Sequence, residues 1–378
     1  MDTVCEKHTF SGIIIERRNL KTTIPLLSKH LLSKDKIPSI IQLNKSYETF
    51  TGKILDTEDT FLRLKQQFSI DVNDLYFSTN YLVILLNQAP TDLQAFPMVN
   101  FELTLNAKFF SHTELIFKLT NGCIQFSAYE VIGDIVHLNL TEEQQKYKKT
   151  IADTIYFKTG KTVINKTGKI EANFRFYHSE ILAGPRKLTT IHKENDVKFF
   201  LDLEKVYWCS RLQSERIRIL NLIKKNDVVC DPFCGAGPHV VPAIKKGAVA
   251  LCNDLNPAAI DCLRKTLEIN KLSCDCVENM EAKDFLFRIR DMHVNHFIFN
   301  LPEFSLDYIK FTECFKGTFW LHVFFFRKNN QSCQEIIKKR TGYAVKDTWL
   351  REVRKVSPSK SVFKLEVNSH EFFSFQKN

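Results

Sequence analysis

The stretch Asp227–Asn256 decides the fold, and it reads DVVCDPFCGAGPHVVPAIKKGAVALCNDLN. Two short apolar runs, Val228–Cys230 and Ala248–Cys252, each lead into an acidic residue. Between them lie the glycine turn Gly235–Gly237 and a run with helical character, Pro238–Lys246. This order predicts a strand, a tight turn, a helix and a second strand that lies parallel to the first.

The acidic residues after these two strands indicate what the turn could bind. The two glycines let the backbone turn tightly and approach a ligand, and the start of the helix offers free N–H groups. Asp254 can accept hydrogen bonds from two ribose hydroxyls. A dinucleotide site would have a third glycine where this chain has Val240. Asp231, followed by Phe233 and Gly-x-Gly, is more typical of the S-adenosylmethionine (SAM) site of Rossmann-type methyltransferases, although a strand–turn–helix unit without a ligand would share the pattern.

The composition fits a protein of two or three domains, because the chain has 378 residues and 44% of them are hydrophobic. No apolar run reaches membrane-spanning length, and the first residues, MDTVCEKHTFSG, lack the apolar segment of a secretory signal. The eleven cysteines are scattered, and the close pairs Cys230/Cys234 and Cys274/Cys276 lack further ligands at zinc spacing. We therefore expect no metal and reduced thiols in a cytoplasmic or nuclear protein, and a mitochondrial pool stays open.

A basic stretch from residue 146 to residue 187 accounts for most of the net charge of +10. It holds ten basic and three acidic residues, and aromatic residues such as Tyr147 and Tyr156 lie among the lysines. This mixture is typical of a surface that contacts a phosphate backbone and stacks on bases. A solvated basic face without a ligand would have the same composition. The basic residues are Lys146, Lys148, Lys149, Lys158, Lys161, Lys166, Lys169, Arg175, Arg186 and Lys187.

The chain divides into three expected domains. Residues 1–105 predict a small α+β module, with a helix at Glu58–Phe68 and a buried strand at Tyr81–Leu86. Residues 106–220 predict a basic α+β domain that binds RNA. Residues 221–378 predict the Rossmann-type α/β core, so the fold class is α/β with N-terminal α+β modules.

The expected elements around the core follow from the alternation of apolar and polar residues. The second domain should hold a strand at Lys169–Phe176 and end in a helix at Ser214–Lys224. Alternating strands and helices in the core predict a mainly parallel sheet with right-handed crossovers. The core strands after the opening stretch are expected at Cys276–Glu278, His296–Phe299, Phe319–Phe326, Trp349–Val356 and Ser361–Val367.

Several motifs together resemble one family, the archaeal and eukaryotic tRNA guanine-N1 methyltransferases that act at position 37 beside the anticodon. The resemblance runs from about residue 130 to the C-terminus, and the first hundred residues carry no matching motif. The motifs are IEANFRFYHSEILAG (170–184), VYWCSRLQSERIR (206–218), DPFCGAGP (231–238), NDLNP (253–257), NLPE (300–303) and VRKVSPSK (353–360).

The resemblance implies the catalytic residues. Guanine N1 carries a proton at neutral pH, so its methylation needs a base, and Glu215 stands at the position of the family's proposed base. A helix-surface glutamate that pairs with a nearby arginine would leave the same pattern. Arg175 matches the arginine that stabilises negative charge on O6. Asn300 would hold the base edge and Pro302 would fix the turn. Tyr177 and Trp208 could stack on a flipped base or pack in a core.

The resemblance also implies the cofactor-binding residues. Asp254 would bind the ribose hydroxyls and Leu255 would pack on the adenine, while Glu281 stands where relatives usually have Asp. The full implied set for SAM is Arg216, Asp231, Gly235, Gly237, Asp254, Leu255, Glu281, Ala282 and Asn300.

The expected function is therefore methyl transfer from SAM to N1 of guanine 37 in tRNA, by a monomer that needs no membrane or obligate protein partner. Two alternatives stay open. One is a related enzyme of wybutosine synthesis that transfers the aminocarboxypropyl arm of SAM. The other is a non-catalytic RNA-binding protein with an inactive cofactor site.

Overall fold

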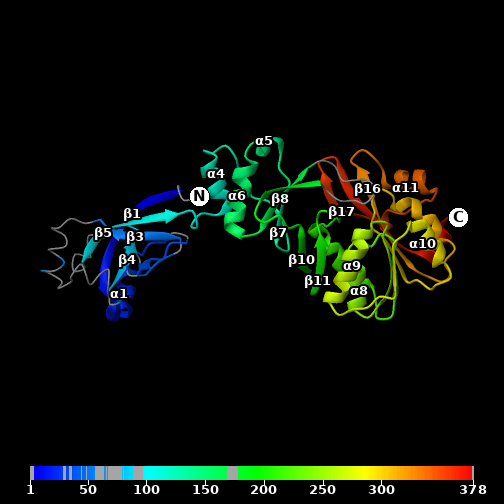
Figure 1. The fold of residues 1–378 in the computed structure, drawn as a ribbon, viewed down its shortest axis with the longest axis horizontal. Coiled ribbons are helices and arrows are strands. Elements are labelled where there is room, and N and C mark those ends of the chain that lie inside the picture. The colour runs from blue at the N-terminus through cyan, green and yellow to red at the C-terminus, as the bar shows by residue number, and fades with distance from the viewer. Residues whose placement is uncertain are drawn as a thin grey trace. The chain divides into compact units, whose positions relative to one another are not determined.

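Contacts within the chain separate it into two units (Figure 1). Unit 1 comprises residues 1–127 and 142–160, and unit 2 comprises residues 128–141 and 161–378. The structure is a computed structural model, and it describes residues 4–28, 31–33, 36–43, 45–47, 49–55, 64, 66, 79, 81–87, 97–167 and 178–376. This two-unit division differs from the three ranges expected from the sequence, which stay a prediction.

Unit 1 is built on a five-stranded antiparallel sheet with the order β2-β4-β1-β5-β3. The predicted strand Tyr81–Leu86 is present as β4. It contains no polar residue because both of its faces are covered: Val83 and Leu85 pack in one apolar cluster, and Leu82 and Ile84 in another. The predicted helix Glu58–Phe68 falls almost entirely outside the described residues. The other strands are β1 (Cys5–Glu16), β2 (Ile40–Ile41), β3 (Phe50–Ile54) and β5 (Met98–Asn106).

The helices of unit 1 have ordinary caps. Helix α4 (His112–Leu119) begins with a capping box, in which the Ser111 side chain accepts from the Glu114 N–H and the Glu114 side chain accepts from the Ser111 N–H. Helix α6 (Lys148–Thr159) ends at Gly160, which adopts a left-handed conformation with φ of 67°. The remaining helices are α1 (Leu20–Leu27) and α5 (Glu142–Gln145).

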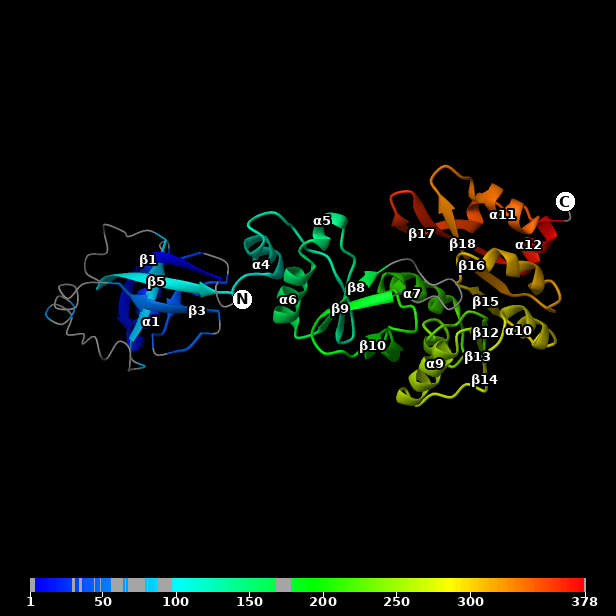
Figure 2. The same cartoon turned by 45° about the horizontal axis from the view of Figure 1, so that its top comes forward.

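Unit 2 contains a seven-stranded sheet with the order β14-β13-β12-β15-β16-β18-β17 (Figure 2). The first five strands in this order are parallel, and β18 runs antiparallel to both of its neighbours. The mainly parallel α/β core is therefore present. Its strands are β12 (Val228–Asp231), β13 (Val249–Asn253), β14 (Cys276–Glu278), β15 (His296–Phe299), β16 (Trp320–Lys328), β17 (Leu350–Ser357) and β18 (Lys360–Asn368).

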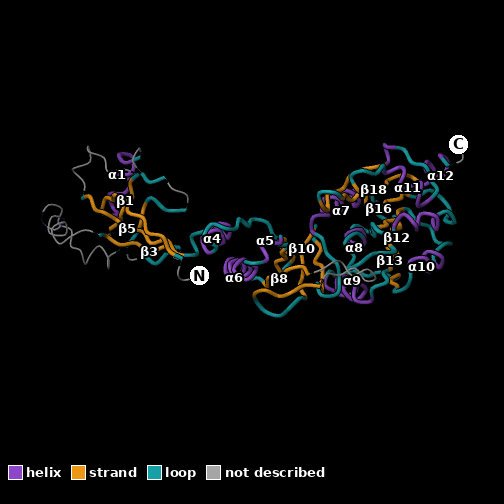
Figure 3. Tube along the Cα trace, turned by 90° about the horizontal axis from the view of Figure 1, so that it is seen from above, coloured by secondary structure: helices purple, strands orange, loops and turns teal. Residues whose placement is uncertain are grey.

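Helices alternate with these strands along the chain (Figure 3). Both faces of the sheet are covered, which explains why the strands read as continuous apolar runs. In β15, Phe297 and Phe299 pack in one apolar cluster, while Ile298 packs on the other side of the sheet against Ile219 and Ile223. The helices are α7 (Gln213–Leu222), α8 (Val240–Lys245), α9 (Pro257–Ile269), α10 (Ala282–Arg288), α11 (Cys333–Thr341) and α12 (Ser369–Phe375).

The remainder of unit 2 packs directly on this core. A four-stranded sheet and a hairpin precede α7, and Phe199 and Leu201 of the hairpin share an apolar cluster with Ile260 and Leu263 of α9. The predicted strand Lys169–Phe176 lies outside the described residues. The elements are β6 (Glu130–Ile132), β7 (Ile135–Leu138), β8 (Thr162–Thr167), β9 (His178–Ala183), β10 (Thr189–Glu194) and β11 (Val197–Asp202).

None of the helices formed by the described residues is long and apolar enough to cross a membrane. Within the same residues, no group of three or more His, Cys, Asp or Glu side chains is arranged to hold a metal ion. All eleven cysteines are free thiols.

Candidate functional site

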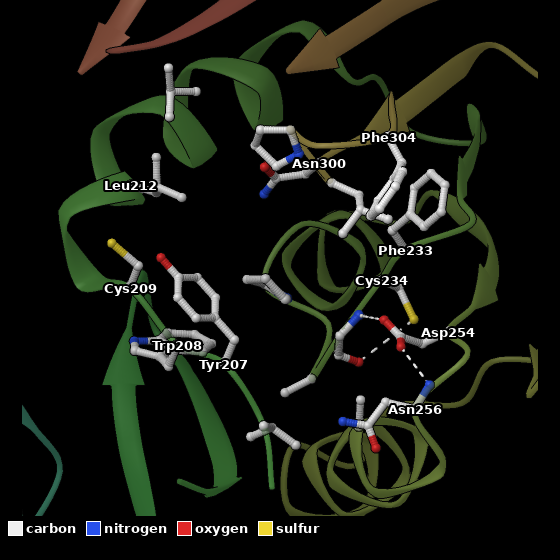
Figure 4. Close-up of a pocket in the computed structure, with 18 of the residues that line it drawn as sticks. Tyr207, Trp208, Cys209, Leu212, Phe233, Cys234, Asp254, Asn256, Asn300 and Phe304 are labelled. Atoms are coloured by element: carbon white, nitrogen blue, oxygen red, sulfur yellow. Dashed lines mark hydrogen bonds between the residues drawn. The ribbon is translucent and has the colours of Figure 1, made fainter. Parts of the chain in front are cut away.

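A cavity of about 590 Å³ opens where the parallel strands of unit 2 end. This edge of an open α/β sheet is where ligands bind, and the volume lies in the range of small-molecule sites. Figure 4 shows its two walls, with Tyr207, Trp208 and Leu212 on one side and Asn300 and Asp254 on the other. Five of the six motifs quoted from the sequence therefore meet around one space, although the lining residues Val206 and Val356 lie 150 residues apart in the chain.

The glycine turn forms the floor of this cavity. Gly235 and Gly237 have positive φ values of 55° and 87°. A side chain at Gly237 would lie 2.6 Å from atoms of Val241 and Leu263, so only glycine fits there. Asp254 fixes the turn, because its Oδ2 accepts from the Gly235 N–H at 2.8 Å. The acidic residue after the second strand thus holds the glycine turn in place as well as lining the cavity.

Asp231 lies beneath the turn and is only 1% exposed. Its Oδ1 accepts from the Phe233 N–H at 3.0 Å, but this bond does not compensate the carboxylate for the hydration that it loses on burial. Burial, reinforced by the nearby carboxylate of Asp254, raises the pKa of Asp231 well above its ordinary value. A cation bound in the cavity would favour the ionised form of this carboxyl.

We predict that Asp231→Asn raises the melting temperature above that of the wild type, and that this difference grows as the pH rises. A carboxyl whose pKa is raised by folding stabilises the protein fully only below its unfolded value, and this contribution is lost as the pH rises through the folded value. The amide keeps the oxygen that accepts from Phe233 and never ionises. The melting temperature of the variant should therefore exceed that of the wild type by about 2–4 °C at pH 8, and by less at pH 5. Parallel melting curves with the same difference at every pH would contradict this prediction.

The next part of the cavity is lined by the residues expected to contact an adenine. Leu255 is 50% exposed and lines the cavity, as do Glu281 and Ala282. Glu281 caps α10, and its Oε1 accepts from the Tyr308 hydroxyl at 2.6 Å. Burial and this hydrogen bond raise the pKa of Tyr308, which therefore stays protonated as a donor. Tyr308 was not foreseen, because nothing near it in the sequence marks it as part of the site.

Two asparagines that the sequence did not single out brace the loop that carries Asp254. Asn253 is fully buried; its Nδ2 donates to the carbonyl oxygens of Pro232 and Met280. Asn279 Nδ2 donates to the carbonyl oxygen of Asp254 at 2.7 Å. These bonds tie the ends of three neighbouring strands together, so the loops at the mouth of the cavity are held in one arrangement.

Asn300 follows β15 and lines the cavity together with Pro302. Its Nδ2 donates to Nε2 of His239 at 3.3 Å. Burial lowers the pKa of His239 to about 3, so the ring is neutral and can accept this bond. The His239 contact orients the amide of Asn300. The turn that follows is held by Ser305, whose Oγ accepts from the Leu301 N–H and donates to the Phe299 carbonyl, each at 2.9 Å.

The opposite end of the cavity is cationic. Lys166 of β8, Arg211 and Arg354 of β17 all line it. Burial lowers the pKa of Lys166, and the neighbouring arginines act in the same direction, whereas Glu130 and Cys209 raise it. Arg354 Nη1 donates to the Cys209 sulfur at 2.8 Å. Glu130 also lines this end and lies 4.0 Å from Arg211, so the three cations leave a net positive charge that suits an anionic group.

Glu215 does not line the cavity. It is 6% exposed, and its Oε1 accepts from Lys364 Nζ at 2.6 Å and from Arg218 Nε at 3.3 Å. Its Oε2 accepts from Arg351. The pairing with Arg218 that the sequence left open is therefore present, but the glutamate is buried rather than on a helix surface. Its role as a base stays a prediction.

Chain neighbours of Glu215 and of its partner Lys364 line the cavity. Leu212, three residues before Glu215, lines it, and this spacing is about one turn of helix. Val362 also lines the cavity and lies two residues, about 7 Å along the strand, from Lys364.

Arg216 was expected to contact the cofactor, but it does not line the cavity. Its guanidinium forms a bidentate pair with Glu194, and its Nη1 donates to the Cys209 carbonyl at 3.1 Å. It is 4% exposed and lies 5.0 Å from the ring of Trp208. Because its donors are directed at these partners, Arg216 holds the Trp208–Cys209 part of the cavity wall in place. Trp208 itself packs in a core cluster and lines the cavity.

Arg175 and Tyr177 lie outside the described residues, so their predicted roles stay predictions. The basic stretch is shared between the two units. Lys146, Lys148, Lys149 and Lys158 belong to unit 1, and Lys161, Lys166, Arg186 and Lys187 belong to unit 2. Lys149 pairs with Asp153 one turn away.

Family models match two parts of the chain. Residues 190–349 match the TRM5/TYW2 methyltransferase domain, and residues 123–187 match the TYW2 N-terminal domain. Among solved structures, the complex of aTrm5 and tRNALeu has a TM-score of 0.66 and 26% identity, covering 94% of this chain and 98% of that one. Trm5b from Pyrococcus abyssi has a TM-score of 0.62 and 21% identity over the same shares, which supports the fold alone. The predicted Rossmann-type methyltransferase fold is therefore confirmed.

Curated relatives carry one name. The tRNA (guanine(37)-N(1))-methyltransferase of Entamoeba histolytica is 33% identical over 71% of this chain and 72% of its own length. The protein of the same name from Encephalitozoon cuniculi is 40% identical over 337 residues, which are 88% of this chain and 87% of the relative. This likeness extends beyond the catalytic core to most of both chains, and it places the chain in the tRNA (guanine(37)-N(1))-methyltransferase family.

Proposed function

We propose that this protein transfers a methyl group from SAM to N1 of guanine 37 in tRNA. The observation that carries the proposal is the single cavity in which Asp254, Asn300 and a cluster of cations meet. A nucleoside cofactor, a purine edge and a phosphate each find a chemical partner there. The relatives that are 33% and 40% identical bear the name of this activity.

The residues at the strand ends fit SAM. Asp254 presents a carboxylate to ribose hydroxyls, and its attachment to the Gly235 N–H keeps that carboxylate in place. Leu255 offers an exposed apolar side chain to the adenine, and Glu281 offers an acceptor to its amino group. When bound, SAM supplies a methyl group activated by a sulfonium. The M. jannaschii Trm5 structure, 25% identical with a TM-score of 0.53, is a complex with adenosine, which supports a nucleoside in this place.

The target base would enter from the cationic end of the cavity. Asn300 offers amide groups to a base edge, and the His239 contact decides which way the amide points. The cations Lys166, Arg211 and Arg354 would bind a phosphate of the nucleotide that carries the base. A base inside a folded anticodon loop must leave its stack to reach such a cavity. The cationic end therefore favours a nucleic acid over a small neutral substrate.

Glu215 is the carboxylate that we assign to the N1 proton. Its side chain is hydrogen-bonded to three cations, and Arg351 is the most exposed of them, with 47% of the side chain accessible. An RNA phosphate could draw Arg351 away from Oε2, which would free that oxygen for the proton. Arg175 is assigned to the developing charge on O6 by family resemblance alone.

The test uses tRNA transcripts that differ only at position 37. The protein is incubated with SAM labelled in the methyl group and with transcripts that carry G37 or A37. We expect label in the G37 transcript alone, and a mass gain of one methyl group on the modified guanine. A mass gain of the aminocarboxypropyl arm would support the wybutosine alternative. Calorimetry that detects no SAM binding would instead favour a non-catalytic RNA-binding protein.

A further inference from the structure

A cluster of charged residues surrounds Glu215, and both Glu215 and Lys364 are buried. Lys364 Nζ donates to Glu215 Oε1 at 2.6 Å and also to Glu366 Oε2. Arg218 donates to both carboxylates as well. Glu366 in turn accepts from Nδ1 of His322 at 2.8 Å. Two carboxylates thus share two cations inside the protein.

The position of this charged cluster follows from the strand that carries it. Side chains of β18 alternate between the two faces of the sheet. Phe363, Leu365 and Val367 pack in the apolar cluster on one face. Val362 packs on the other face against Ile219 and Ile223 of α7, so Lys364 and Glu366, spaced by two, face α7 as well.

This arrangement is costly for the fold. Lys364 is 0% exposed, on a strand whose neighbouring residues are apolar. Removing two charged groups from water costs several kcal/mol per ion, and a well-packed apolar pair at such a site is often as stable. A methionine at position 364 would continue the apolar run of this strand, in which Phe363 and Leu365 are its neighbours. The energetic cost of these buried charges directs attention to a role at Glu215 itself.

The charged groups around Glu215 come from every element packed against it. Arg218 lies on its own helix, Lys364 and Glu366 on β18, Arg351 on β17 and His322 on β16. Beyond them, His296 of β15 bonds His322 at 3.2 Å and Asp227 at 3.2 Å. Burial lowers the pKa of His296 to about 4, so this ring is neutral near pH 7. Burial raises the pKa of Glu366, but the bonds from His322 and Arg218 outweigh it and lower the pKa below its ordinary value.

We infer that Lys364 and Glu366 are positioning residues that set how readily Glu215 takes up a proton. Lys364 holds the Glu215 carboxylate by a direct bond from its ammonium group, and this carboxylate is the group assigned to the N1 proton of guanine. Glu366 accepts from the same lysine and from Arg218, and so weakens the bonds that these two cations make to Glu215. The inference rests on the proposed function, because it assigns Glu215 to that proton.

The experiment is the pH dependence of single-turnover methyl transfer to the G37 transcript, from pH 5 to pH 9. In Lys364→Met the acidic limb of the profile should move about one pH unit higher, because a buried carboxylate without its cation takes up a proton more readily. At pH values on that limb the rate should then fall about tenfold, with little change at pH 9. In Glu366→Gln the same limb should move in the opposite direction, because both cations are left to Glu215.

Lys346→Met is the matched control, since Lys346 also pairs with a glutamate, Glu371 at 3.2 Å, but at the surface. It should leave the profile unchanged. SAM binding by each variant checks that the core is folded. Variants that lower the rate by one factor at every pH, or that shift the limb in the same direction, would overturn the inference and leave the proposed function standing. A wild-type protein that transfers no methyl group to G37 would instead overturn the proposed function, and the inference with it.

Discussion

Glu215→Gln is expected to slow single-turnover methyl transfer by about 10²–10⁴-fold, the usual contribution of a general base. Glutamine keeps an oxygen that can accept from Lys364 and Arg218, but it cannot take up the N1 proton. SAM and tRNA affinities should change little, because Glu215 does not line the cavity. Rapid-quench measurement with enzyme in excess over the G37 transcript isolates this step from product release.

The exposed Glu268 of α9 provides a control, and Glu268→Gln should react like the wild type. A wild-type rate in Glu215→Gln would remove the glutamate from the mechanism. In that case its bonds to Lys364, Arg218 and Arg351 would be structural ion pairs that happen to lie beside the cavity.

Asp254→Ala should weaken SAM binding by about a hundredfold. Hydrogen bonds to charged groups contribute about 1.5–3 kcal/mol, and the carboxylate is the proposed partner of the ribose hydroxyls. The substitution also releases the Gly235 N–H and the Asn256 N–H, which Asp254 accepts at 2.8 and 2.9 Å. The glycine turn should therefore lose its fixed shape, and methyl transfer at low SAM concentration should fall in the same proportion.

Titration calorimetry with SAM measures this loss. The control is Asp261→Ala, which removes an exposed carboxylate from α9, one turn beyond the same loop. Equal affinities for SAM in the two variants would show that Asp254 does not bind the cofactor. A titration carried to a high SAM concentration would further show whether Asp254→Ala is folded, because a folded variant still yields a binding isotherm there.

The sequence predicted the cavity's floor because its determinants are local. Gly235, Gly237 and Asp254 lie within twenty residues of one another, and each meets a requirement of backbone geometry or of a strand end. The order of strands and helices followed from the same local signals. Asn300 and Pro302 could be placed at the same edge, because every parallel strand in such a sheet ends there.

The surroundings of Glu215 and Arg216 could not be predicted in this way. Glu215 is separated from Lys364 by 149 residues in the chain, and a glutamate in a helix of mixed polarity gives no sign that it is buried. Arg216 lies in a motif that suggested a ligand, yet its guanidinium is already paired with Glu194, which lies on a hairpin 22 residues earlier. Such pairings depend on how β10, α7 and β18 pack, which the pattern of a single segment does not contain.

The division of the chain was hard to predict for a related reason. The basic stretch reads as one domain, but α6 belongs to unit 1 and β8 to unit 2. Strand β11 packs on α9 through Phe199 and Leu201, so these apolar residues complete the methyltransferase core rather than a separate domain. Composition identifies a basic segment but not the core on which each of its elements packs.

The sheet order has a consequence for synthesis on the ribosome. β18 follows β17 in the chain, yet it lies between β16 and β17. Until residues 360–368 leave the exit tunnel, β16 presents an open edge with three consecutive phenylalanines, Phe324–Phe326. An unpaired apolar edge of this kind is a template for aggregation. We therefore expect the nascent protein to be prone to aggregation at this stage, and a truncation upstream of β18 to yield insoluble polypeptide rather than a partly active enzyme.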